Sequence, residues 1–99
     1  VEQNIISDNF SLGKPYPNPF NPRVGIELTL DSSDSYDVSI YNLKGERIKD
    51  WSSVKLDAGK QTLHWNSMDE DGNISPSGVY FFTVMGKNKR EHRKLLLIR

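Results

Sequence analysis

The sequence predicts an all-β fold, an antiparallel β-sandwich of about seven short strands, and three observations support this prediction. Apolar residues recur at every second position in several short segments, which is the period of a half-buried strand. Clusters of Gly, Pro, Asn and Asp separate these segments, as turns between strands require. No segment shows the helical period of about 3.6 residues.

The first long strand follows a proline-rich lead-in. Pro17, Pro19 and Pro22 have no backbone N–H group and disfavour helix, so residues 13–22 are expected to form a rigid, extended crossing. Immediately afterwards, residues 24–30 alternate between apolar and polar or small side chains. We therefore expect a strand at 24–30, entered through a stiff connection.

The later strands are expected at residues 36–43, 46–51, 60–66, 79–85 and 89–98. A tight turn at Gly45 separates the second and third of the long strands, and residues 52–59 are expected to form a looser connection. Residues 79–85 are apolar on both faces, which predicts a central strand. Alternation with Leu63 and Val79 places Trp65 and Phe81 in the core. The order of hairpins favours an immunoglobulin-like or fibronectin-III-like sandwich.

Length and composition fit a single small domain. The chain has 99 residues and begins without methionine, so we expect a piece of a longer protein, with residues 1–9 as a linker from an upstream host protein and residues 10–99 as the domain. Net charge is zero, which gives no general attraction to nucleic acid. No apolar run has the roughly 20 residues of a transmembrane helix. The absence of cysteine excludes thiol chemistry and thiolate metal sites.

The sequence offers no convincing catalytic, metal or cofactor site. The acidic segment 69–73 invites a calcium interpretation, but its glycine comes too early for an EF-hand, and a turn at Asp71-Gly72 explains it better. His64 and His92 have no neighbouring ligands at strand spacing. Phosphate-loop and nucleophile-elbow motifs are absent. We therefore expect no enzyme activity and no cofactor.

An ordered series of motifs resembles the type A C-terminal sorting domain of the bacterial type IX secretion system, a family that grades into the immunoglobulin-like domain of flagellar hook-capping proteins. The series runs from about Phe10 to the last residue and comprises segments 10–26, 38–48, 58–66, 71–82 and 94–98. The residues that carry it as structural motif positions are Pro17, Asn18, Pro19, Gly45, Trp65, Gly72, Gly78 and Tyr80.

This resemblance implies a non-catalytic module that directs its host protein through the type IX secretion system, for release or for anchoring at the outer-membrane surface, via the periplasm. The implied partners are the secretion translocon and a sortase-like peptidase of the cell envelope. A cut by that peptidase would fall within residues 1–9, beside the upstream host-protein domains. Two alternatives remain open: a structural spacer domain of a secreted hydrolase, and a carbohydrate-binding module that uses Trp51.

The last predicted strand is basic, with six Lys or Arg residues and one acid after residue 85. Such a strand can simply resist unwanted pairing at a sheet edge. Since the resemblance implies that the secretion machinery reads this terminal region, the candidate recognition residues are Lys89, Arg90, Arg93, Lys94 and Arg99.

Overall fold

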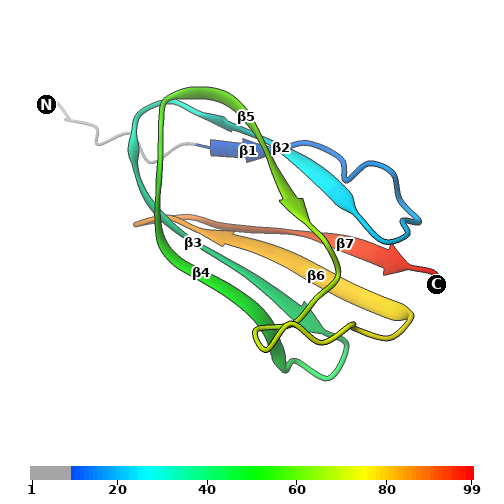
Figure 1. Cartoon of the computed structure of the whole chain (residues 1–99). Coiled ribbons are helices and arrows are strands. Elements are labelled where there is room, and N and C mark those ends of the chain that lie inside the picture. The colour runs from blue at the N-terminus through cyan, green and yellow to red at the C-terminus, as the bar shows by residue number, and fades with distance from the viewer. Residues whose placement is uncertain (1–9) are drawn as a thin grey trace, which may run out of the picture.

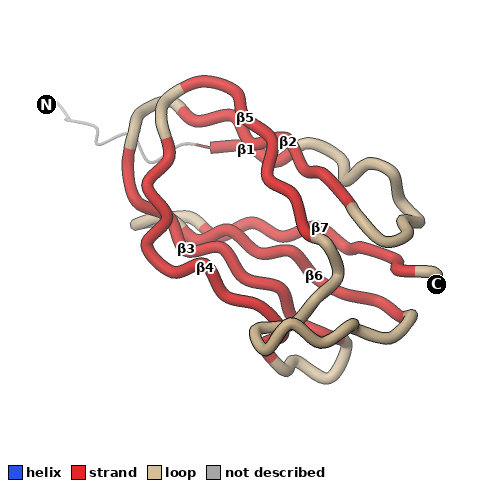
Figure 2. The backbone as a smooth tube through the Cα atoms, in the orientation of Figure 1, coloured by secondary structure: helices blue, strands red, loops and turns tan. Residues whose placement is uncertain are grey.

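The computed structural model describes residues 10–99 as two antiparallel sheets packed face to face (Figures 1 and 2). The predicted linker, residues 1–9, lies outside the described residues. The seven strands are β1 (Phe10–Leu12), β2 (Val24–Leu30), β3 (Asp34–Asn42), β4 (Arg47–Leu56), β5 (Gly59–Trp65), β6 (Gly78–Met85) and β7 (Arg90–Leu97). One sheet has the order β1-β2-β5 and the other the order β4-β3-β6-β7. Residues 10–99 include no helix with the length and apolarity needed to cross a bilayer.

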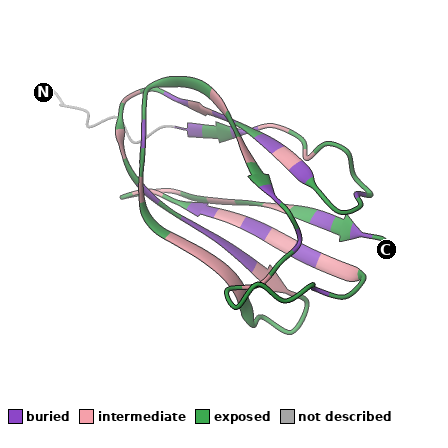
Figure 3. Ribbon diagram, viewed as in Figure 1, coloured by how far each residue is buried: buried purple, intermediate pink, exposed green. Residues whose placement is uncertain are grey.

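Alternate residues of both sheets fill the space between them, and Figure 3 shows this alternation along β6. In β2, Val24, Ile26, Leu28 and Leu30 are all buried while the residues between them are not. β6 lies between β3 and β7, which confirms the predicted central strand. The pattern of apolar residues thus predicts the two layers correctly.

One strand is longer than predicted. β4 extends to Leu56, so much of the segment expected to be a loose connection continues the pairing with β3. A bulge makes this possible: Ser53 adopts a positive φ of 55°, and its N–H donates to the carboxylate of Asp37 at 2.8 Å. After the bulge the ladder resumes with Tyr36 opposite Val54. Serine-rich segments resemble loops in sequence, which hides such a bulge.

The assignment of Phe81 to the core was wrong. Tyr80, Phe82 and Val84 are the buried residues of β6, whereas Phe81 is half-buried on the outer face beside His92. A strand that is apolar on both faces gives no sequence signal of which face is inward, because either parity fits.

The proline-rich segment, residues 13–22, leaves the β1-β2-β5 sheet, contacts β7 of the other sheet and then returns to begin β2. Near its start, Tyr16 pairs with Gly25 through two hydrogen bonds of 2.9 Å and so extends the β1 side of β2. Four residues later, Phe20 forms a parallel bridge with Leu97 of β7. In Figure 1 this connection passes from β1 toward the end of β7 near the C-terminus. The crossing closes one side of the sandwich.

Candidate functional site

The outer edge of β7 is covered by the proline motif. The Phe20 N–H donates to the Leu96 carbonyl at 2.9 Å, and the Phe20 carbonyl accepts from the Ile98 N–H at 3.0 Å. Two residues before Phe20, the Asn18 side chain donates to the Lys94 carbonyl at 3.1 Å and accepts from the Leu96 N–H at 2.9 Å. Pro17 and Pro19, which flank Asn18, offer no N–H for a further strand.

Two of the predicted recognition residues face inward and bind the first strand. The Lys89 Nζ donates to the carbonyl of Phe10, and the Arg93 guanidinium donates to the carbonyl of Leu12, both at 2.7 Å. Glu91 lies between them, 3.3 Å from Lys89 and 3.8 Å from Arg93. These side chains therefore join the free edge of β1 to β7 and to the residue that precedes it.

Arg99 also binds within the domain. Its Nε donates to the Ser75 carbonyl at 2.6 Å and its Nη2 to the Ser67 hydroxyl at 2.8 Å. Ser67 is fully buried and Ser75 is 4% exposed. The guanidinium thus holds the connection between β5 and β6 against the end of the chain, which is a structural task.

Arg90 and Lys94 differ from the other three. Both are exposed on the outer face of β7, and neither forms an ion pair within residues 10–99. Lys94 lies opposite Phe81 in the ladder, and Arg90 lies opposite Met85. The five predicted recognition residues therefore do not form one surface, because only Arg90 and Lys94 point outward from the strand with free cations.

The motif residues gather at the end of the sandwich where the proline segment crosses. Trp65 is 2% exposed, its ring centroid lies 5.2 Å from that of Tyr80 and 5.9 Å from that of Phe20, and its indole N–H donates to the Met68 carbonyl at 2.9 Å. Burial raises the pKa of the Tyr80 phenol, which donates to the Pro76 carbonyl at 2.6 Å. These aromatic residues pack the core beneath the crossing.

Two of the motif glycines, Gly45 and Gly72, occupy turns as expected, and the third, Gly78, lies in a strand. Gly45 and Gly72 have φ values of 86° and 82°, in the region that favours glycine. Asn42 stabilises the first turn by accepting from the N–H groups of Lys44 and Glu46. Gly78 begins β6 opposite Leu97.

The acidic loop has its carboxylates engaged by the backbone. Asp69 accepts from the N–H groups of Asp71 and Asn73, both at 2.9 Å, and Glu70 accepts from the N–H of Asp50 at 2.6 Å. Within residues 10–99, no three His, Cys, Asp or Glu side chains lie close enough together to hold a metal ion. Hydrogen bonding to the backbone thus accounts for Asp69 and Glu70.

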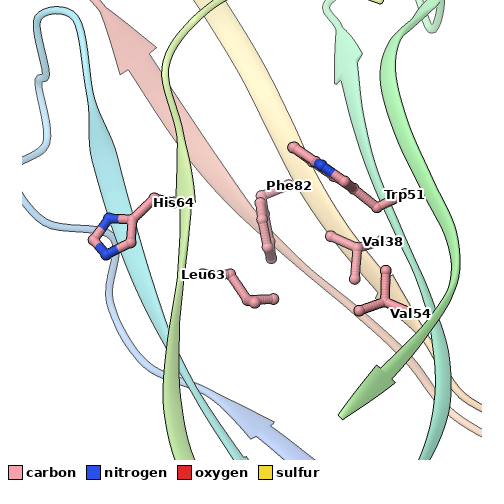
Figure 4. Close-up of a pocket in the computed structure, with 6 residues that line it drawn as sticks. All are labelled: Val38, Trp51, Val54, Leu63, His64 and Phe82. Atoms are coloured by element: carbon pink, nitrogen blue, oxygen red, sulfur yellow. The ribbon is translucent and has the colours of Figure 1, made fainter.

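An apolar hollow, which the sequence does not predict, lies between β4 and β5 on the side of the sandwich opposite the proline crossing (Figure 4). It has a volume of about 100 Å³ and is lined by Val38, Trp51, Val54, Leu63, His64 and Phe82. Val54 lies in the segment expected to be a loop, so no alternation marked it. Trp51 is half-buried at the rim, and the Lys49 ammonium lies 5.7 Å from its ring centroid. The Lys49 ammonium therefore competes with a sugar for one face of the Trp51 ring.

Comparisons with known proteins agree with this architecture. Dimeric latent PorU from Porphyromonas gingivalis matches with a TM-score of 0.75 and 17% identity, over 99% of this chain and 10% of PorU. FlgD from P. aeruginosa matches with a TM-score of 0.58 and 27% identity, over 75% of this chain and 58% of FlgD. PorZ, a surface component of the type IX secretion system of P. gingivalis, matches with a TM-score of 0.56 and 24% identity, over 93% of this chain and 12% of PorZ.

This chain therefore spans about a tenth of PorU and PorZ and little more than half of FlgD. The likenesses to PorU and PorZ show the fold. No curated protein sequence matches the chain. A family model does match, over residues 21–90, and it describes the FlgD Ig-like domain. The β-sandwich seen here, with its proline-covered last strand, thus belongs to the family of FlgD Ig-like domains.

Proposed function

We propose that this domain is a non-catalytic sorting module, which directs a host protein through a type IX secretion system to the cell surface or the medium. The observation that carries the proposal is the joining of the proline motif to the last strand through Asn18 and Phe20. Asn18 and Leu96 are 78 positions apart in sequence, and their hydrogen bond joins the proline motif and the terminal strand into one structural unit. The fold shared with PorU over 99% of this chain supports the same proposal.

Within that unit, the outward cations of β7 are the residues that a secretion partner would contact. Arg90 and Lys94 are exposed on one face of the strand, whereas Lys89, Arg93 and Arg99 bind the domain itself. Replacing all four basic residues from 89 to 94 would combine loss of a surface with loss of closure. The informative variant is therefore the double substitution Arg90→Gln and Lys94→Gln.

The experiment attaches the 99-residue chain to the C-terminus of an inert reporter that carries its own inner-membrane export signal, in a cell with a type IX system. We expect the parent reporter on the cell surface or in the medium, and the double variant in the periplasm. The control is Lys44→Gln with Lys55→Gln, two exposed lysines that lie in the β3–β4 turn and in β4.

The outcomes separate the two parts of the proposal. Periplasmic retention of the parent reporter would contradict a sorting role. Export of the double variant at the parent level would show that Arg90 and Lys94 are not recognised, while sorting by another surface would stand.

A structural spacer role is the second candidate. Membership of the FlgD Ig-like family and the 27% identity to FlgD favour it, since this chain matches only part of that protein. A spacer predicts that the reporter stays in the periplasm although the domain is folded, which the same fractionation measures.

A further inference from the structure

The four edge strands of the sandwich differ in how their free edges are covered. The proline motif covers β7 from Lys94 onward, and Lys89 and Arg93 bind the free carbonyls of β1. Glu70 covers the first half of β4, because its N–H donates to the Ile48 carbonyl at 3.1 Å and its carboxylate accepts from the Asp50 N–H. In the described part of the chain, β5 pairs with β2 alone and no segment covers its other edge.

The register shows which backbone groups of β5 point to this open edge. Gly25 exchanges both of its backbone hydrogen bonds with Tyr16 on the β1 side, so the neighbouring even-numbered residues of β2 bond toward β5. Their partners are Trp65, Leu63, Gln61 and Gly59. The N–H and C=O groups of the intervening residues Lys60, Thr62 and His64 therefore point outward along the edge.

The apolar hollow lies directly beside this edge, on the inner side of the sandwich. Leu63 of β5 forms one wall, and Val54 and Trp51 of β4 form the other (Figure 4). At about 100 Å³ the hollow is smaller than the ~150 Å³ cavity that holds a benzene ring. It has the size for a branched aliphatic side chain.

The outer side of the same edge carries basic and polar side chains and no acidic ones. The outward side chains of β5 are Lys60, Thr62 and His64, all exposed, and the strand carries no acid. Arg23 and His64 line an adjoining hollow together with Trp51 and Asn66. A strand added here would set its outward side chains directly beside these groups, where acidic residues are favoured and basic ones are not.

We propose that the free edge of β5 binds an extended peptide segment of a partner protein, which adds as a further strand and alternates aliphatic with acidic residues. The backbone of Lys60, Thr62 and His64 supplies the ladder of hydrogen bonds. One aliphatic side chain of the segment fills the hollow between Leu63 and Val54, and acidic side chains lie next to Lys60 and His64 on the outer side. This inference does not depend on the proposed sorting role.

A second copy of this chain fits the edge less well. An antiparallel pairing of two β5 strands about Thr62 would place Lys60 of each strand opposite His64 of the other, so neither lysine would gain an acidic partner. It would also leave the hollow without an aliphatic side chain, because Gln61 and Leu63 already belong to the inner faces of their own domains. The acidic segment is therefore the preferred occupant.

The test uses the whole chain, labelled with ¹⁵N, and a capped peptide of sequence Glu-Val-Glu-Ile-Glu-Val-Glu. Titration followed by amide chemical shifts should place the changes at residues 59–65 and around the hollow. Hydrogen exchange at Lys60, Thr62 and His64 should slow by about tenfold or more when the peptide is in excess. A peptide of the same composition, with its acids and its aliphatic residues grouped in separate blocks, should bind about tenfold more weakly.

Two variants test the two sides of the edge. Thr62→Pro removes an outward N–H without touching the ladder to β2, and should weaken binding about tenfold relative to Thr62→Ala, which keeps that N–H. Lys60→Glu should weaken binding about threefold through charge repulsion, whereas Lys44→Glu in the distant β3–β4 turn should not. The second pair remains informative if the proline variant does not fold.

Three results would overturn the proposal. The first is that the chemical-shift changes are centred away from residues 59–65. The second is that the block-ordered peptide binds with equal affinity. The third is that the amides of Lys60, Thr62 and His64 exchange slowly without peptide while the protein forms a concentration-dependent dimer. The last result would assign the edge to a second copy.

Discussion

The side-chain oxygen of Asn18 accepts a hydrogen bond from the backbone N–H of Leu96 at 2.9 Å, across 78 positions of sequence. The amide nitrogen of the same side chain donates to the Lys94 carbonyl. One side chain thus reproduces the donor and acceptor that a paired strand would present to β7. An asparagine is suited to this position because it combines both functions and tolerates a proline on either side.

Asn18→Ala should therefore destabilise the domain by roughly 1–3 kcal/mol, since it leaves two backbone groups of β7 without their partner. Chemical denaturation followed by tryptophan fluorescence measures the change. Asn21→Ala is the matched control: it also replaces an exposed asparagine that precedes a proline, and it should change stability by no more than about 0.5 kcal/mol. Equal effects at the two positions would contradict the pairing role.

Trp65→Ala should cost roughly 3–5 kcal/mol, because it empties a fully enclosed site between Phe20 and Tyr80. That is a large part of the stability of a domain of this size. The half-buried Trp51 provides the comparison, and Trp51→Ala should cost clearly less. A loss below about 1 kcal/mol for the Trp65 variant would show that the indole is not a core element.

Arg99→Gln should loosen the connection between β5 and β6. The guanidinium donates to the Ser75 carbonyl and to the Ser67 hydroxyl. A hydrogen bond from a charged group contributes up to about 3 kcal/mol to the free energy of unfolding. We expect faster amide exchange in residues 66–77 and a lower free energy of unfolding. Arg90→Gln, on the exposed face of β7, should change neither quantity, and Arg99→Lys should restore only part of the loss because it lacks the planar fork.

Stability should fall in alkaline solution through Tyr80. Its pKa is raised by burial in the folded state, whereas an unfolded tyrosine titrates near about 10. The folded state therefore holds the phenolic proton more tightly, so the contribution of Tyr80 is complete below pH ~10 and is lost as pH rises through the folded pKa. The free energy of unfolding should be measured from about pH 8 to about pH 11, a range that spans the ordinary tyrosine pKa of about 10. It should fall more steeply with pH for the parent than for Tyr80→Phe. Parallel losses would contradict this assignment.

The acidic loop should not bind calcium. Asp69 already accepts two backbone N–H groups, and Glu70 accepts a third from Asp50. Calcium needs six to eight oxygen ligands, so binding would require breaking the bonds that shape the loop. Isothermal titration with millimolar calcium should give no binding heat, and a saturable signal would refute the prediction.

The sequence predicts the layers of this fold well and its edges poorly. Strict alternation in β2 determined its inward face, because one parity was apolar and the other was not. β6 was located correctly, yet the outward position of Phe81 was missed because both of its faces are apolar. The bulge at Ser53 was also missed, since a positive φ at serine has no clear sequence signal.

The candidate site illustrates the same limit. The basic strand was recognised from composition, but composition does not tell an inward cation from an outward one. Lys89 and Arg93 bind carbonyls of β1 that lie about 80 positions away, and only the folded register brings them together. The open edge of β5 likewise depends on which segments cover the other three edges.

Residues 94–99 form two separate sets of hydrogen bonds, one with the proline segment and one with the connection between β5 and β6. A ribosome delivers these residues after everything that they hold in place. Until residues 94–99 have been synthesised, the proline segment and the connection between β5 and β6 lack these hydrogen-bond partners. Closure of the sandwich is therefore one of the last steps in the folding of this domain during synthesis, because the residues that complete it are made after all the strands that they join.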